Sequence, residues 1–110
     1  MTKQAVLVNL DRPRGLRFRH AALSALEQHF GCKLGDIGDK LGNPGADDLT
    51  AFLWAGLLWE DKALTLAGTA KLIDEGESEY GEILAAVFEA FNLAFGQPKN
   101  VTGPVESGTG

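Results

Sequence analysis

Hydrophobic positions along this chain recur mostly at three- and four-residue intervals, which is the spacing of one face of an α-helix. The richest segment covers residues 47–61, where apolar side chains occupy most of the helix circumference. They form two neighbouring stripes, Leu49, Phe52, Leu53, Gly56 and Leu57 in one and Trp54, Leu58 and Trp59 in the other. A helix that is apolar nearly all round must be covered on several sides. Either the rest of the chain wraps this helix, or another protein does.

The N-terminal segment has the composition and alternation of β-strands. Residues 5–10 predict a first strand, and residues 11–15 predict a turn in which proline fixes one φ angle and glycine permits a positive one. Residues 16–19 alternate apolar and basic side chains, so they predict a second strand that pairs back. A lone hairpin is marginal in water. We therefore expect the apolar side chains of the second strand to pack on the helices, while Arg17 and Arg19 face solvent or a partner.

The next segments predict two helices ahead of the apolar one. Residues 20–30 place apolar side chains on one face, and Gly31 follows as a C-terminal cap. Residues 34–41 suggest a shorter helix, although each of its glycines weakens it by about 1 kcal/mol relative to alanine. The Asn-Pro-Gly run at 43–45 is a helix breaker. The apolar helix is therefore expected to begin at residue 46 or 47.

Two further helices complete the expected domain. Thr65 is a good N-cap for a helix that ends at Gly76, and Ser78 is expected to cap a last helix that ends at Gly96. The broad apolar face of this last helix, interpreted as core, comprises Tyr80, Ile83, Leu84, Val87, Phe88, Phe91 and Phe95. Residues 97–110 have a Pro, Gly, Ser, Thr and Asn composition that predicts a disordered, flexible tail. The expected fold class is mainly α: a small helical domain at 1–96 with four to five helices and a short N-terminal β-hairpin.

Composition agrees with one small domain. The chain has 110 residues, of which 45% are hydrophobic. It has no apolar run of about 18 residues to cross a bilayer and no secretory signal, so we expect a cytosolic protein without a membrane partner. Cys32 is the single cysteine, which excludes an internal disulfide and a cysteine-based zinc site. It is most simply a small packing residue.

The charge distribution is uneven. A net charge of −5 argues against nucleic acid as the main partner. Residues 1–20 nevertheless hold five basic side chains against the single acid Asp11, and most acids lie beyond Asp36. A basic segment of this kind could bind phosphates, or it could stack on the acidic side of a neighbouring copy. The candidates for such self-association are Arg12, Arg14, Arg17, Arg19, Asp74, Glu75, Glu77 and Glu79.

Catalytic and metal-binding patterns are missing from the sequence. His20 and His29 do not have one-turn helical spacing, and neither belongs to a His-Glu-x-x-His motif. Adjacent acids such as Asp47 and Asp48 point in different directions on a helix, so capping and solubility explain them better than acid–base chemistry. The glycines at 35–45 lack the Gly-Lys-Ser/Thr ending of a phosphate loop. We therefore expect a non-enzyme with no catalytic residue, metal or cofactor.

The order of several segments carries a family resemblance. A hairpin leads into a helix that stops at Phe30-Gly31 and is followed by the run Asp-Leu-Thr-Ala-Phe-Leu-Trp-Ala-Gly-Leu-Leu at 48–58. An acidic pair at 60–61 and a Leu-Thr-Leu at 64–66 come next. Over residues 6–95, this order resembles the tail assembly chaperones of long-tailed bacteriophages and the related gene transfer agents.

The resemblance implies a small, non-catalytic helical protein that binds and shields the tape measure protein before the tail tube polymerises around it. It implies residence in the cytoplasm of the bacterial host, absence from the finished virion, and a longer product made by ribosomal frameshifting that recruits tail tube subunits. Pro98-Lys99-Asn100 is compatible with a slippery codon run of this kind. The expected partner-binding residues are Trp54, Leu58, Trp59, Phe91 and Phe95.

Two other function classes remain open at this point. A helical adaptor would bind one apolar peptide or helix of a host or regulatory partner, with Trp54, Leu58 and Trp59 forming a helix-in-groove site. A small enzyme is the third class, and no group of residues in the sequence supports it. Whether Trp59 belongs to the core or to a contact surface is also left open, because tryptophan is rarely fully buried.

Overall fold

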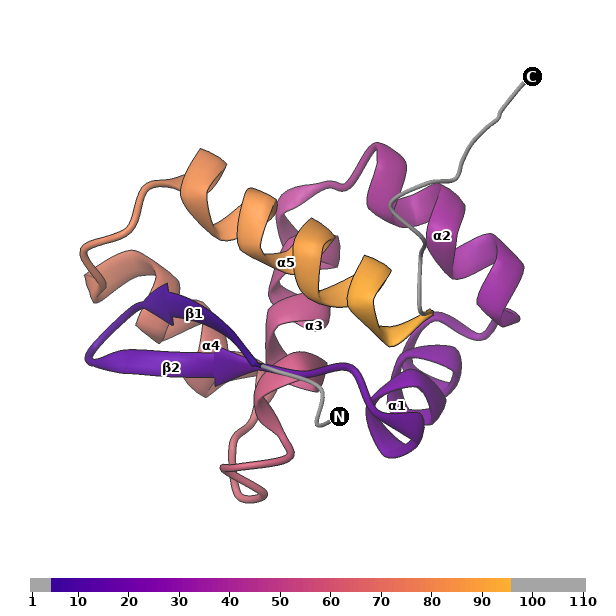
Figure 1. Cartoon of the computed structure of the whole chain (residues 1–110), viewed down its shortest axis with the longest axis horizontal. Helices are drawn as coiled ribbons and strands as arrows, with labels where there is room; N and C mark the ends of the chain where they lie inside the picture. Colours follow the sequence, from indigo (N-terminus) through magenta and orange to yellow (C-terminus); the bar gives the residue numbers. More distant parts are fainter. Residues whose placement is uncertain (1–4, 96–110) are drawn as a thin grey trace.

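A computed structural model describes residues 5–95 of the chain. Within that range an antiparallel β-hairpin is followed by five helices, which confirms a mainly α fold with an N-terminal hairpin (Figure 1). The elements are β1 (Val6–Asn9), β2 (Pro13–Leu16), α1 (His20–Phe30), α2 (Leu34–Gly42), α3 (Ala46–Leu57), α4 (Leu66–Glu75) and α5 (Tyr80–Ala94). The tail expected at 97–110 and the tripeptide at 98–100 lie outside the described residues.

Helix α3 lies at the centre of the fold (Figure 1). Helices α1, α2, α4 and α5 and strand β2 all contact it. Seven of its 12 residues are buried, namely Leu49, Ala51, Phe52, Leu53, Ala55, Gly56 and Leu57. The chain itself therefore wraps the helix whose apolar surface extends nearly all round, as the first of the two sequence-based alternatives requires.

Local capping signals explain where three helices begin or end. Gly31 adopts a left-handed φ of 68° and its N–H donates to the Glu27 carbonyl at 2.8 Å, which ends α1 as predicted. The Thr65 hydroxyl accepts a hydrogen bond from the Gly68 N–H at 3.0 Å, which confirms the predicted cap of α4. At the start of α3, the Gly45 N–H donates to the Asp48 carboxylate at 3.1 Å.

The second strand and its turn lie earlier than the sequence pattern suggested. Strand β2 begins at Pro13, which pairs with Asn9, so the turn comprises residues 10–12 and not 11–15. Proline is tolerated here because it is the first residue of an edge strand. Gly15 does not supply a positive φ; a Cβ at this position would lie 2.8 Å from the Ala5 Cβ. Close packing, and not turn geometry, is what requires glycine here.

Two predicted helix boundaries were also wrong. Helix α3 ends at Leu57 and tightens into a turn at 58–60, where the Leu58 and Glu60 N–H groups donate to the carbonyls three residues before them, at 3.3 and 3.2 Å. Helix α5 is capped at Glu79 and not at Ser78. The Glu79 N–H donates to the Glu82 carboxylate at 2.9 Å, a bond across three residues that selects the glutamate as the helix start.

Candidate interaction surfaces

The expected partner-binding residues differ in how far they are buried and in the contacts that they make. Trp54 is half-buried; its Nε1 donates to the Leu64 carbonyl at 3.0 Å and its ring lies 6.4 Å from that of His29. Leu58 is half-buried in the turn after α3. Phe91 is only 4% exposed and belongs to the core. The indole of Trp54 therefore holds the loop before α4 against α3.

Trp59 both packs and remains accessible. Its Nε1 donates to the Gly15 carbonyl at 2.9 Å, and the Arg17 guanidinium carbon lies 5.0 Å from the centre of its ring. The side chain is nevertheless 37% exposed. The residue therefore fastens the hairpin to the loop after α3 and leaves part of its ring in solvent.

A series of aromatic rings connects the core to the surface of α5. The Phe91 ring makes edge-to-face contacts with Phe18, Phe52 and Phe95 at centroid distances of 5.5, 5.9 and 4.8 Å. Phe95, at the end of the series, is 46% exposed. Phe91 therefore fixes the position of Phe95, while only Phe95 is available to a partner.

Helix α5 presents a further apolar surface that sequence reasoning assigned to the core. Tyr80 and Phe88 are 53% and 37% exposed, and Leu84 between them is half-buried. Positions four residues apart lie on the same side of a helix, and Phe95 falls on that side as well. We call Tyr80, Leu84, Phe88 and Phe95 the α5 stripe.

The opposite side of α5, which includes Ile83 and Val87, is buried, and the helix contacts β1, β2 and α3. Assigning all of the apolar residues of α5 to the core was therefore wrong for Tyr80, Phe88 and Phe95. A clue was present in the sequence. The core-facing stripe of a surface helix is roughly 100° wide, and the apolar positions of α5 occupy a wider arc.

The four arginines expected at a self-association surface have different environments. Arg14 is buried; its Nε and Nη2 donate to the two Asp11 carboxylate oxygens at 2.7 and 3.0 Å, and its Nη1 donates to Asp61 at 3.4 Å. The hydrogen bond from Arg14 lowers the pKa of Asp11, and the bond to Asp11 raises the pKa of Arg14. Arg14 therefore holds the hairpin turn to the loop after α3 and has no surface left for a partner.

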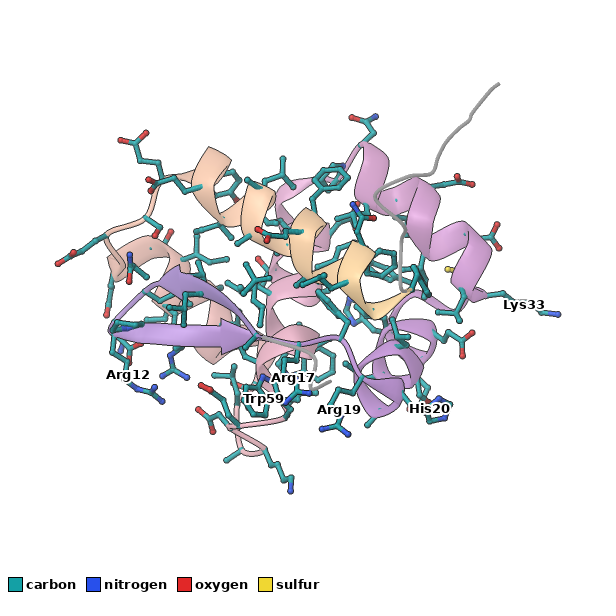
Figure 2. The ribbon with its side chains drawn as sticks, in the orientation of Figure 1. Arg12, Arg17, Arg19, His20, Lys33 and Trp59 are labelled. Carbon is teal, nitrogen blue, oxygen red and sulfur yellow. The ribbon has the colours of Figure 1, made fainter. Side chains whose placement is uncertain are left out.

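The other three arginines are closer to solvent. Arg12 lies 4.0 Å from the Glu60 carboxylate. Arg17 covers Trp59, and Arg19 is exposed at the start of α1. Figure 2 shows these residues along one edge of the molecule. The four expected acidic partners are all exposed and lie at the end of α4 and in the α4–α5 connection: Asp74, Glu75, Glu77 and Glu79.

Other chemistry is not apparent in the part of the chain that the structure describes. Residues 5–95 contain no group of three or more His, Cys, Asp or Glu side chains placed to hold a metal ion. None of the helices in that range is both long enough and apolar enough to cross a membrane. Cys32 is half-buried between α1 and α2. No protein-family model, curated protein or solved structure matches this chain.

Proposed function

We propose that this chain is a non-catalytic tail assembly chaperone that binds a long helical partner, the tape measure protein, through the α5 stripe. The observation that carries the proposal is the exposure of Tyr80, Phe88 and Phe95 on one side of a helix whose other side is built into the core. Aromatic side chains clustered on a surface are typical of the residues that anchor protein partners. The sequence resemblance described above supports the choice of partner.

The geometry of the stripe suits a helical partner. The 15 residue steps from Tyr80 to Phe95 correspond to about 22 Å along a helix at about 1.5 Å per residue. A partner helix of about four turns would cover that length. Trp59 and the half-buried Leu58 and Trp54 lie outside the stripe, so we assign them a secondary role.

The area of the stripe implies weak binding per copy. Aromatic side chains bury about 150–250 Å² each, so the exposed parts of Tyr80, Phe88 and Phe95 amount to about 200–340 Å² in total. At about 25 cal/mol per Å², covering this area contributes about 5–9 kcal/mol of favourable binding free energy. Association itself costs about 4–15 kcal/mol. A single contact would therefore be weak, and many copies along one long partner would be needed for stable shielding.

Weak, repeated contacts are what a removable cover requires, because each copy can leave separately when a tube subunit replaces it. In the related chaperones, recruitment of tube subunits belongs to a longer, frameshifted product. For this chain, that extension remains part of the proposal. The alternative adaptor would make one contact with one partner, so the number of bound copies separates the two functions.

Substitutions on the stripe test the proposal. The chain is co-expressed with the very long helical protein that the proposal expects to be encoded beside it, and the mass of the purified complex gives the number of copies bound. We expect several copies per partner for the wild type, and at least a tenfold loss of binding for Phe88→Asp combined with Phe95→Asp. Ala67→Asp combined with Ala70→Asp is the matched control, because both positions are exposed on α4, outside the stripe, and the change adds the same two negative charges.

Thermal unfolding of each variant shows whether the fold is kept. Undiminished co-purification of the double variant would refute the α5 stripe as the binding surface. A complex holding a single copy would favour the adaptor.

A further inference from the structure

Among the described residues, two of the basic side chains near the N-terminus have no acidic partner, and one of them lies beside an exposed tryptophan. Arg17 lies over the Trp59 ring, and its backbone N–H donates to the Gly56 carbonyl at 2.9 Å, so the segment is fixed to α3. Arg19 and His20 follow and are exposed. Within residues 5–95, neither Arg17 nor Arg19 forms an ion pair. We call Arg17, Arg19, His20 and the open face of Trp59 the basic edge (Figure 2).

The acids of the α4–α5 connection form the opposite kind of surface. Between residues 71 and 82 there are five acids and one lysine, and the five acids are all exposed: Asp74, Glu75, Glu77, Glu79 and Glu82. We call these five residues the acidic turn. Among the described residues none of them forms an ion pair.

The backbone of the acidic turn is held in place on both sides. A Cβ at Gly76 would lie 2.6 Å from the Leu72 carbonyl oxygen and 3.0 Å from the Leu10 Cα, so the turn packs closely on the hairpin. The Glu79 N–H is bonded to the Glu82 carboxylate. The acidic side chains therefore project from a fixed backbone, which lowers the entropy lost when they bind.

The two surfaces are well separated in the molecule. In Figure 1 the α4–α5 connection lies at the left end of the long axis, whereas the start of α1 lies towards the right. A copy of the chain therefore does not satisfy its own basic edge with its own acidic turn. Every neighbouring copy carries an acidic turn that complements the charge of the basic edge. A nucleic acid is a less suitable partner, because the net charge of −5 opposes its binding.

We propose that the basic edge of one copy binds the acidic turn of a second copy. A contact between two unlike surfaces repeats from copy to copy, so it generates chains or rings of subunits. This contact does not depend on the α5 stripe or on the tape measure protein. It is an inference about how the chain associates with itself, whatever partner it covers.

Salt provides a first test, because charges on a surface are screened over about 8 Å at physiological ionic strength. Sedimentation velocity of the full chain should show assemblies at about 50 mM NaCl that weaken about tenfold or more at about 500 mM. Assemblies that are unchanged or strengthened by salt would overturn the proposal, because they indicate an apolar interface. A wild type that stays monomeric at low salt would overturn it too.

Charge reversal gives the decisive test, and the helix dipole allows variants that should keep the fold. Arg19→Glu with His20→Glu places acids at the N-terminus of α1, and Asp74→Lys with Glu75→Lys places bases at the C-terminus of α4. Both changes are favourable for their helices. We expect each double variant alone to be monomeric at about 50 mM NaCl. An equimolar mixture of the two should assemble again, because two complementary contacts alternate along the chain of subunits. The native edge of the second variant meets the native turn of the first, and the reversed edge of the first meets the reversed turn of the second.

Asp39→Lys with Glu89→Lys is the matched control for Asp74→Lys with Glu75→Lys, because it makes the same change in net charge at exposed positions outside the acidic turn. It should assemble like the wild type, as should Phe88→Asp on the α5 stripe. Failure of the mixture to assemble would overturn the proposal, as would double variants that assemble normally. If the Asp39 and Glu89 control also failed to assemble, net charge would explain the loss of assembly in the variants. That result would overturn the proposed contact as well.

Discussion

Replacing Gly56 with alanine should destabilise this protein, although alanine is the better helix former. Gly56 lies in the last turn of α3, beneath the segment that joins β2 to α1. A Cβ there would lie 2.7 Å from Leu16 Cδ2 and 3.1 Å from Phe18 Cζ. Leu16 and Phe18 are 0% and 5% exposed, so neither side chain can turn into solvent. The added methyl group must therefore push two packed side chains apart.

The size of the effect follows from two opposing terms. Replacing glycine with alanine inside a helix stabilises the folded state by about 1 kcal/mol, because alanine has the higher helix propensity. Overpacking a well-filled core costs about 1–3 kcal/mol, and the upper part of that range applies because the Arg17 backbone is also bonded to the Gly56 carbonyl. We expect a net loss of about 1–2 kcal/mol in the free energy of unfolding.

Gly38→Ala is the control, since a Cβ at Gly38 in α2 has no neighbour within 4 Å. The free energy of unfolding of Gly38→Ala should rise by about 0.5–1 kcal/mol. Urea unfolding followed by circular dichroism measures both variants. With a slope of about 2 kcal/mol per M, the midpoint should fall by about 0.5–1 M for Gly56→Ala and rise for Gly38→Ala. A Gly56→Ala midpoint at or above that of the wild type would show that the hairpin segment is not packed on α3 as described.

Two further predictions concern the hydrogen bonds that fix local structure. Thr65→Ala removes the hydroxyl that accepts the Gly68 N–H, so we expect a loss of about 0.5–2 kcal/mol in urea unfolding; an unchanged midpoint would contradict the cap. Arg14 lowers the pKa of Asp11 below its ordinary value of 3.8, so the charged carboxylate stabilises the fold above that pH and the contribution is lost as the pH falls below it. The melting temperature should therefore fall more steeply below about pH 4 in the wild type than in Asp11→Asn, and parallel profiles would refute this role.

Features set by neighbouring residues could be predicted from the sequence. The bounds of α1 followed from the apolar spacing and from Gly31, and the start of α4 followed from Thr65, because caps act within one turn of a helix. The apolar circumference of α3 predicted that the helix is covered on several sides, although it left open whether this chain or a partner covers it. The caps and the apolar spacing both lie within or directly beside the helix whose bounds or burial they predict.

Features set by distant residues could not be predicted in this way. The hairpin turn is held by a hydrogen bond from Arg14 to Asp61, which lies 47 residues further along the chain. The turn that ends α3 is held by a hydrogen bond from Trp59 to the Gly15 carbonyl, 44 residues away in sequence. The same limit applies to the candidate surfaces. Periodicity identified the wide apolar arc of α5, but only the packed structure shows that β1, β2 and α3 leave Tyr80, Phe88 and Phe95 exposed.

The central claim is that the α5 stripe binds a long helical partner, and site-specific cross-linking tests it most directly. A photoreactive benzoylphenylalanine is placed at position 88, within the stripe, or at position 89, which is exposed on the same helix and points about 100° away from the stripe. Each form is then illuminated in complex with the long helical protein that the proposal expects to be encoded beside this gene. Cross-links from position 88 to several sites along that protein, with few from position 89, are the predicted result. Equal cross-linking from both positions, or none from position 88 in an intact complex, would contradict the account.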